Sequence, residues 1–235
     1  MKKAVVSFAD GAGNYAKSLM RLEHSLRATS FNGEFKGYND YAHIGSKQHK
    51  TDPDAVPYQF KAMAIDKAIK EGATGLLWCD SVVYATKSIE PIFNHIKEHG
   101  YIFFDNIGYS IGDYTSDACL KKFGMSRDEA FNSKMLMACV MGFNLSHPKA
   151  IEFLNKYIDA SKDGVSYPGA WSNENLEVSN DMRVKGHRHD QSVASIIVKQ
   201  MGLTITNAQD TFFAYTSHKG IVKIADTVCL WSEGI

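Results

Sequence analysis

The sequence has few cysteines, no excess of charge and no long apolar run, and each absence excludes a class of protein. The 235 residues carry 26 Lys plus Arg against 26 Asp plus Glu, so the formal net charge is zero. No long-range attraction to nucleic acid or to an anionic membrane is therefore expected. No stretch of about 18 apolar residues is present, so the sequence predicts no membrane span. The apolar run near the start stops at Ala9, which is too short for a secretion signal.

The four cysteines are widely separated, at Cys79, Cys119, Cys139 and Cys229. Since no two form a Cys-x-x-Cys pair, the spacing excludes a zinc ribbon and a thioredoxin-like motif. Three of the four stand in apolar stretches, which is typical of buried, reduced thiols. We therefore expect a reducing compartment and a cytoplasmic location.

Strand-like and helix-like segments alternate along most of the chain. Apolar, β-rich runs predict strands at residues 4–9, 75–78, 101–104 and 135–145, with shorter ones within 34–44 and at 203–206, 212–215 and 227–230. Helical spacing of apolar residues predicts helices at residues 15–28, 59–70, 89–99, 117–123, 126–132, 147–160 and 190–201. This alternation favours one α/β domain with a mainly parallel sheet covered by helices.

Three of the predicted strands are followed directly by a carboxylate, at Asp10, Asp80 and Asp105. Ligands of open α/β sheets bind at the carboxyl ends of the strands, so these side chains are candidates for a site. The alternative is that each aspartate simply caps the turn or helix after its strand.

Two glycines after the first strand raise the question of a dinucleotide site. Gly11 and Gly13 stand between a predicted strand and a predicted helix, but Ala16 replaces the third glycine of the fingerprint. The pattern favours a generic nucleotide-binding loop over a nicotinamide site.

The stretch "HRHDQS", residues 187–192, places two histidines, an arginine and an aspartate just before a predicted helix. These residues are candidates for catalysis, or they are loop residues with Asp190 as the helix N-cap. A metal-dependent phosphohydrolase would need an all-helical domain, which the many predicted strands exclude.

The order of several short motifs resembles small bacterial or viral glycosyltransferases of the GT-A type. These motifs are a strand ending in Trp-x-Asp-Ser, the helix "SIEPIFNHI" and the later "HRHDQS", together with "YQFKAMAIDKAI" and "CVMGFNLSHPKAIEFLNKY". The resemblance runs from about residue 4 to 215. It implies a GT-A-like, Rossmann-related α/β fold in a single domain, residues 1–235. A donor-nucleotide half would cover about residues 1–110 and an acceptor half about 111–235.

The resemblance also implies roles for individual residues. Asp190 is the candidate base or acceptor-orienting carboxylate, and His189 and Gln191 would position it. The candidate donor-binding residues are Ser7, Phe8, Asp10, Lys61, Asp80, Ser81 and Arg188. Apart from the resemblance, the aromatic-rich loop 163–173 contains Tyr167 and Trp171, which would stack on an acceptor sugar or simply pin the loop.

The sequence departs from the family pattern at the metal site. Asp80 matches the first aspartate of the Asp-x-Asp element, but Val82 stands at the second. Two alternatives follow. Asp80 binds Mn²⁺ or Mg²⁺ together with His218, or Asp80 holds sugar hydroxyls while Lys61 or Arg188 neutralises the leaving diphosphate.

The expected function is transfer of a hexose or pentose from a nucleotide-sugar donor to a hydroxyl. The acceptor is open between a glycan, a lipid-linked sugar, a protein and a modified nucleic-acid base. Two alternatives remain: a non-catalytic nucleotide- or sugar-binding protein, and a sugar nucleotidyltransferase, against which the loop after Asp10 counts because it has no arginine. The transferase hypothesis requires Asp80 and Asp190 to meet in one crevice.

Overall fold

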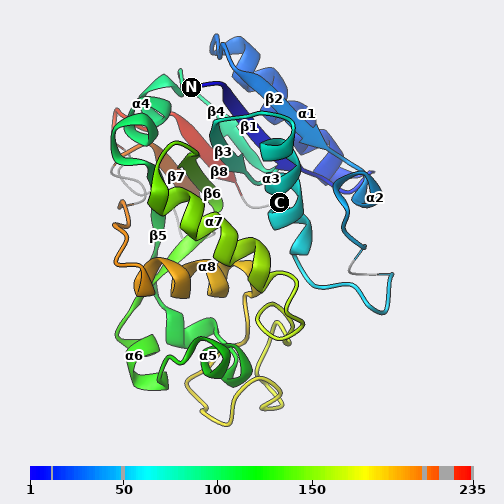
Figure 1. Ribbon diagram of the computed structural model, residues 1–235, viewed down its shortest axis with the longest axis vertical. Coiled ribbons are helices and arrows are strands. Elements are labelled where there is room, and N and C mark those ends of the chain that lie inside the picture. The colour runs from blue at the N-terminus through cyan, green and yellow to red at the C-terminus, as the bar shows by residue number, and fades with distance from the viewer. Residues whose placement is uncertain (12, 49–50, 208–210, 217–224, 234–235) are drawn as a thin grey trace.

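A five-stranded sheet forms the centre of the protein (Figure 1). The computed structural model describes residues 1–11, 13–48, 51–207, 211–216 and 225–233. In spatial order the strands are β2 (Glu34–Tyr38), β1 (Lys3–Phe8), β3 (Gly75–Cys79), β6 (Lys134–Asn144) and β5 (Tyr101–Ser110). β6 is antiparallel to both of its neighbours, and the other four strands share one direction. The predicted mostly parallel sheet is confirmed.

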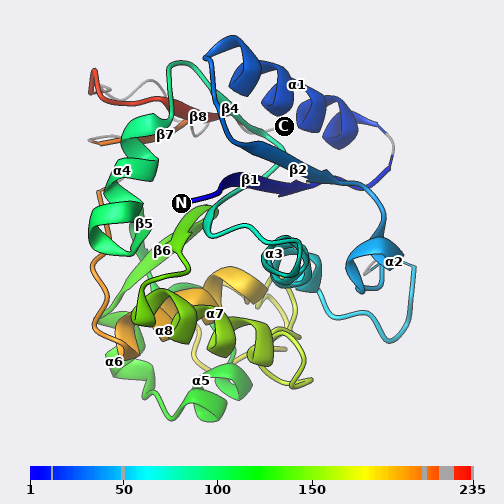
Figure 2. The ribbon, with the colours of Figure 1, turned by 45° about the horizontal axis from the view of Figure 1, so that its top comes forward.

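Helices cover both faces of this sheet (Figures 1 and 2). One face carries α3 (Gln59–Lys70), α7 (Pro148–Ala160) and α8 (His189–Gln200). The opposite face carries α1 (Asn14–Ala28), α4 (Glu90–His99) and a small sheet of β4 (Val83–Ala85), β8 (Leu230–Glu233) and β7 (Phe213–Thr216). The shorter elements are α2 (Tyr41–Ile44), the 3₁₀ helix η1 (Ile111–Tyr114), α5 (Asp117–Phe123) and α6 (Arg127–Phe131).

Strand β3 shows why the sheet is buried on both sides. Leu76 and Trp78 point into the core beneath α3, α7 and α8, whereas Leu77 and Cys79 point into the core beneath α1 and α4. All four side chains are buried, as expected for an apolar run in the middle of a sheet covered by helices.

Two helices, at residues 59–70 and 117–123, have the predicted bounds, but the structure corrects several strands. β5 continues to Ser110, so Asp105 lies within the strand and not at its end. Residues 203–206 contribute a single bridge, Thr206 to Phe104, and the last strand begins at Leu230. The segment 34–44 forms one strand and then the short helix α2, whose first turn is capped by the Asp40 side chain.

The structure bears on two further predictions from the sequence, which concern the cysteines and the membrane-spanning segments. The four cysteines are all free thiols, and three of them are buried. None of the helices in the described ranges combines the length and the apolar character needed to cross a bilayer.

Candidate active site

A cavity of about 780 Å³ opens beside the carboxyl end of β3. Its walls come from the end of β3, residues 137–139 of β6, residues 106–109 of β5, and the N-terminal ends of α3 and α8. Loop residue Trp171 closes one side. The volume lies within the range of small-molecule sites, about 300–1,000 Å³.

Asp80 and Asp190 meet in this cavity through Lys61. The Lys61 ammonium nitrogen lies 3.1 Å from Asp80 Oδ1 and 2.8 Å from Asp190 Oδ2. It also donates to the Ala138 carbonyl oxygen at 2.9 Å. The convergence of the two aspartates in one crevice is therefore confirmed, and both carboxylates are held by one buried cation.

The two carboxylates differ in their exposure. The Asp80 side chain is 37% exposed, whereas that of Asp190 is 5% exposed. Trp78 Nε1 donates to Asp80 Oδ1 at 2.7 Å, and the Tyr157 hydroxyl donates to Asp190 Oδ2 at 3.5 Å. Burial raises the pKa of the Asp190 carboxyl, and the Lys61 charge opposes that rise. Asp80 therefore faces the open cavity, whereas Asp190 is buried beside it.

The first turn of α8 directs Asp190 inward. His189 has a φ of +46°, a conformation uncommon for a residue other than glycine. Its Nδ1 pairs with the Tyr167 carbonyl oxygen at 2.9 Å, and its ring stacks on Tyr58 with centroids 5.2 Å apart. His189 is thus buried behind the cavity, where it fixes the backbone next to Asp190.

The alternative that Asp190 caps α8 is wrong, because the helix has no side-chain N-cap and Asp190 pairs with Lys61 instead. The backbone N–H of Arg188 donates to Ser192 Oγ at 3.1 Å. Gln191 lines the cavity, and its Nε2 donates to the Leu136 carbonyl oxygen at 2.8 Å. The three residues of "HDQ" therefore have different surroundings, although they are adjacent in the chain.

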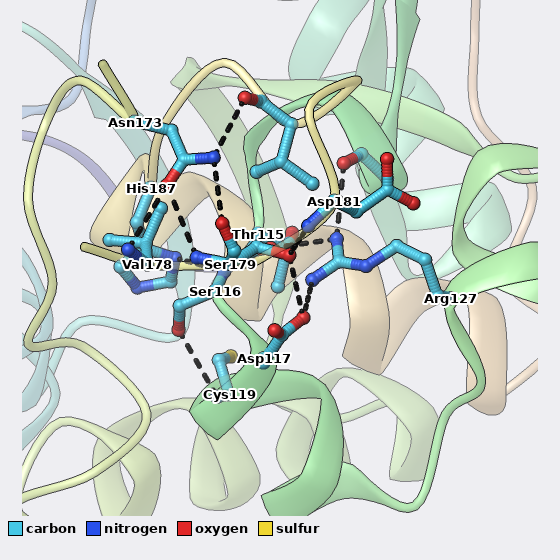
Figure 3. A network of polar contacts seen from close by, with 12 residues as sticks. Thr115, Ser116, Asp117, Cys119, Arg127, Asn173, Val178, Ser179, Asp181 and His187 are labelled. Atoms are coloured by element: carbon cyan, nitrogen blue, oxygen red, sulfur yellow. Dashed lines mark hydrogen bonds and ion pairs between the residues drawn. The ribbon is translucent and has the colours of Figure 1, made fainter. Parts of the chain in front are cut away.

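The long loop before α8 is held by a buried polar network (Figure 3). Asn173 donates through Nδ2 to the carbonyl oxygens of Ser179 and Val184, and its Oδ1 accepts from the N–H groups of Val178 and Ser179. His187 accepts from the Ser116 N–H through Nδ1, at 3.2 Å. The middle of the loop and its end are therefore fixed, and Trp171 of the same loop lines the cavity.

The predicted residues at the end of β1 lie outside this cavity wall. Ser7 is fully buried, and its hydroxyl has no hydrogen-bond partner among the described residues. Phe8 packs on Tyr41 and Phe60, with ring centroids 4.7 and 4.9 Å away. Asp10 accepts from Gln48 Nε2 at 3.0 Å.

The two remaining donor-binding candidates, Ser81 and Arg188, differ in their access to the cavity, and Asp105 is not at the end of its strand. Ser81 is 5% exposed and does not line the cavity, whereas Arg188 does. Asp105, which the sequence suggested as a third strand-end carboxylate, is buried within β5, 3.8 Å from the Lys134 ammonium nitrogen. It does not line the cavity, whereas the next residues of β5, 106–109, do.

The described donor groups around Asp80 do not fit a divalent cation. Asp80 Oδ1 already accepts from Trp78 and lies beside Lys61, whose ammonium occupies the space between the two carboxylates. Within the described ranges no group of three His, Cys, Asp or Glu side chains is arranged to hold a metal ion. His218, the other proposed ligand, lies outside the described residues.

Sequence reasoning did not identify Tyr58, Tyr114 and Tyr157 as parts of the site. Tyr58 and Tyr114 line the cavity, and Tyr157 contacts Asp190 from α7. Tyr157 stands on an apolar helical face, where an aromatic residue is usually a core residue. Tyr58 precedes α3 with a φ of +58°, a feature that the sequence does not reveal.

With its mixed five-stranded sheet, its covering helices and its strand-end cavity, the chain has the fold of a GT-A-type glycosyltransferase. Among solved structures it is similar to a glycosyltransferase involved in the glycosylation of the major capsid of PBCV-1, with a TM-score of 0.57. The alignment covers 98% of this chain and 92% of that one at 14% identity. The galactosyltransferase LgtC in complex with donor and acceptor sugar analogs aligns over 98% of this chain and 86% of its own, at 14% identity and a TM-score of 0.47. No protein-family model matches the chain, and no curated protein matches it in sequence.

Proposed function

We propose that the protein is a glycosyltransferase that moves a sugar from a nucleotide-sugar donor to a hydroxyl acceptor. The observation that carries this proposal is the placement of Asp80 and Asp190 on two sides of Lys61 in one open cavity. The fold supports it, because in α/β sheets ligands bind at this edge of the strands.

In this mechanism the two carboxylates have different roles. Glycosyl transfer passes through an oxocarbenium-like state, which nearby carboxylates stabilise. Asp80, more exposed and at the end of β3, holds hydroxyls of the donor. Asp190, whose pKa burial raises, accepts the proton of the attacking hydroxyl, because a base works best when its pKa approaches the working pH. Gln191 and His189 keep Asp190 in place.

The donor and the acceptor approach this point from different sides. β1 and β3 are parallel neighbours, so the end of β1, with Ser7, Phe8 and Asp10, lies beside Asp80 at the same edge. In the proposal Asp10, which is not buried, contacts the nucleoside, and the buried Ser7, Phe8 and Ser81 support the strand ends behind it, within the donor half of residues 1–110. The acceptor enters along residues of the half 111–235, with Trp171 at the cavity wall.

The first experiment identifies the nucleotide. Thermal-shift screening against uridine, guanosine, cytidine and thymidine diphosphates, with and without Mn²⁺, is followed by hydrolysis and transfer assays with the corresponding hexose and pentose donors. Binding without any turnover would favour a non-catalytic binding protein. Formation of a nucleotide sugar from a sugar phosphate would favour a nucleotidyltransferase. Full activity in excess chelator would show that no divalent cation is needed.

The second experiment tests the role of Asp190. Asp190→Asn removes the base but keeps the shape of the side chain, so turnover is expected to fall about a hundredfold or more while the protein stays folded. Asp159→Asn, on α7 away from the cavity, is the matched control. Near-normal transfer by Asp190→Asn would remove Asp190 from the chemistry. The cytoplasmic location and the identity of the acceptor remain predictions that cell fractionation and acceptor panels address.

A further inference from the structure

Two cations line the cavity, Lys61 and Arg188, and only one of them is available to a ligand. The Lys61 side chain is 3% exposed, and its nitrogen contacts Asp80, Asp190 and the Ala138 carbonyl oxygen. An ammonium group has three N–H donors, so these three partners use them all. Lys61 has no donor left for a phosphate.

Arg188 is held in a different way. Its guanidinium carbon lies 4.1 Å from the centroid of the Tyr114 ring and 3.8 Å from that of Trp171. Both rings therefore pack closely against the guanidinium, and one of its N–H groups donates to the Trp171 carbonyl oxygen. The aromatic contacts fix the plane of the guanidinium, as expected for arginine stacked on aromatic rings. A second contact of the guanidinium goes to the Tyr114 side chain, and the donors that remain lie in that plane, at the cavity wall.

Arg188 differs from Lys61 in that no carboxylate of the described residues contacts it directly. Among the residues that the structure describes, no carboxylate forms an ion pair with it, whereas Lys61 has two such partners. Burial lowers the pKa of the Arg188 guanidinium, which reflects a partly desolvated charge. A desolvated cation without a counter-ion is costly, and an anionic ligand removes that cost.

The formal charges of the cavity residues also favour Arg188 as the residue that binds a diphosphate. Lys61, Asp80 and Asp190 together carry a charge of −1, and Arg188 brings the total to zero. A diphosphate entering near the two aspartates is repelled unless it meets Arg188. A planar guanidinium also matches phosphate oxygens in a bidentate geometry.

We propose that Arg188, packed against Tyr114 and Trp171, binds the diphosphate of the donor, and that Lys61 is a positioning residue for Asp80 and Asp190. This inference rests on the proposed function. In the transfer, the bond between the anomeric carbon and the diphosphate oxygen breaks, and its electron pair stays on that oxygen beside Arg188. The acceptor oxygen bonds to the anomeric carbon, and the acceptor proton goes to Asp190.

The decisive experiment compares ligands with and without phosphate. Calorimetry measures inorganic pyrophosphate, uridine diphosphate and uridine, together with whichever other diphosphate and nucleoside pair the thermal-shift screen selects. Arg188→Met is expected to lose about tenfold or more of its affinity for pyrophosphate and the diphosphate, with nucleoside affinity unchanged. Arg188→Lys keeps the positive charge but not the paired N–H donors of the guanidinium, so an intermediate loss of diphosphate affinity is expected. Arg183→Met, an exposed arginine paired with Asp181, is the control.

Lys61 is tested with the same ligands. Lys61→Gln removes one positive charge from the cavity, so it is expected to lose some diphosphate affinity, but clearly less than Arg188→Met loses. It is also expected to lower kcat and to raise the pH at which activity is lost in acid, because Asp190 loses its cation. Where Lys61→Gln does not fold, Lys61→Arg serves, with unchanged diphosphate affinity expected. Unchanged pyrophosphate affinity in Arg188→Met, or an equal loss in the Lys61 variant, overturns the inference. Pyrophosphate binding that depends on Arg188 but comes without sugar transfer would refute the proposed function and leave the anion site standing.

Discussion

His187 allows a quantitative test of the buried network that holds the loop before α8. Its side chain is fully buried, and it needs an unprotonated Nδ1 to accept the Ser116 N–H, while Nε2 pairs with the Ser166 carbonyl oxygen at 3.1 Å. Burial, with a smaller contribution from His189, lowers the pKa of His187 from 6.5 to about 3. The folded protein therefore holds a neutral imidazole at a pH where the unfolded chain holds an imidazolium.

The sign and size of the effect follow from this pKa difference. The contribution of His187 is fully present above the unfolded pKa of 6.5 and is lost as the pH falls from there toward 3. At about pH 5 the difference of roughly 1.5 pKa units corresponds to about 2 kcal/mol of lost stability, at 1.36 kcal/mol per unit. At about pH 7.5 the loss is close to zero.

Urea unfolding of the wild type and of His187→Gln, at about pH 7.5 and about pH 5, isolates this contribution from all other titrating groups. His187→Gln lowers stability at both values, but its free energy of unfolding is expected to fall by about 2 kcal/mol less between them than that of the wild type. Equal pH dependence in the two proteins would refute the view that His187 is neutral and buried in the folded state.

Three further predictions concern the loop and the base. Asn173→Ala leaves four backbone groups without their partner, so a loss of roughly 2–4 kcal/mol in the free energy of unfolding is expected by urea titration. Gly186→Ala places a Cβ 1.9 Å from the Trp171 carbonyl oxygen, whereas Gly164→Ala meets nothing within 4 Å, although both have positive φ. Gly186→Ala should thus weaken pyrophosphate binding and stability well beyond the Gly164 control, and equal behaviour would contradict it. For Asp190, burial raises the pKa of the carboxyl above its ordinary value of 3.8, so kcat/KM is expected to fall in acid with a midpoint above pH 3.8. A midpoint at pH 3.8 or below would argue against Asp190 as the base.

The sequence predicted most of the architecture because its core strands and helices carry strong local signals. The helix at residues 59–70 has regular apolar spacing and a glycine just after its end, and its bounds were predicted correctly. β5 was predicted too short, since its second half carries exposed residues such as Ile107 and Tyr109 that do not look like a buried strand. Strand pairing depends on neighbours distant in the chain, so the reversed direction of β6 was not predictable from local pattern.

The candidate site was predictable in part. The residues Lys61, Asp80 and Asp190 were identified as functional candidates, and the structure brings them together. Their mutual arrangement was not predictable, because it depends on the packing of α3 against α7 and the first turn of α8. For that reason the sequence suggested Lys61 as a phosphate ligand, although its three donors are taken within the protein.

The reversed strand β6 provides the floor of the cavity, and it holds the functional side chains through its main chain. The carbonyl oxygens of Leu136 and Ala138 accept from Gln191 and Lys61, and that of Cys139 accepts from the Asp80 N–H. The side chains of Met137 and Cys139 line the cavity but make none of these anchoring contacts. Under the proposed function, substitutions at these two positions would alter the wall that a sugar meets and leave the three main-chain contacts in place, while both side chains also pack against the core beneath α1 and α4.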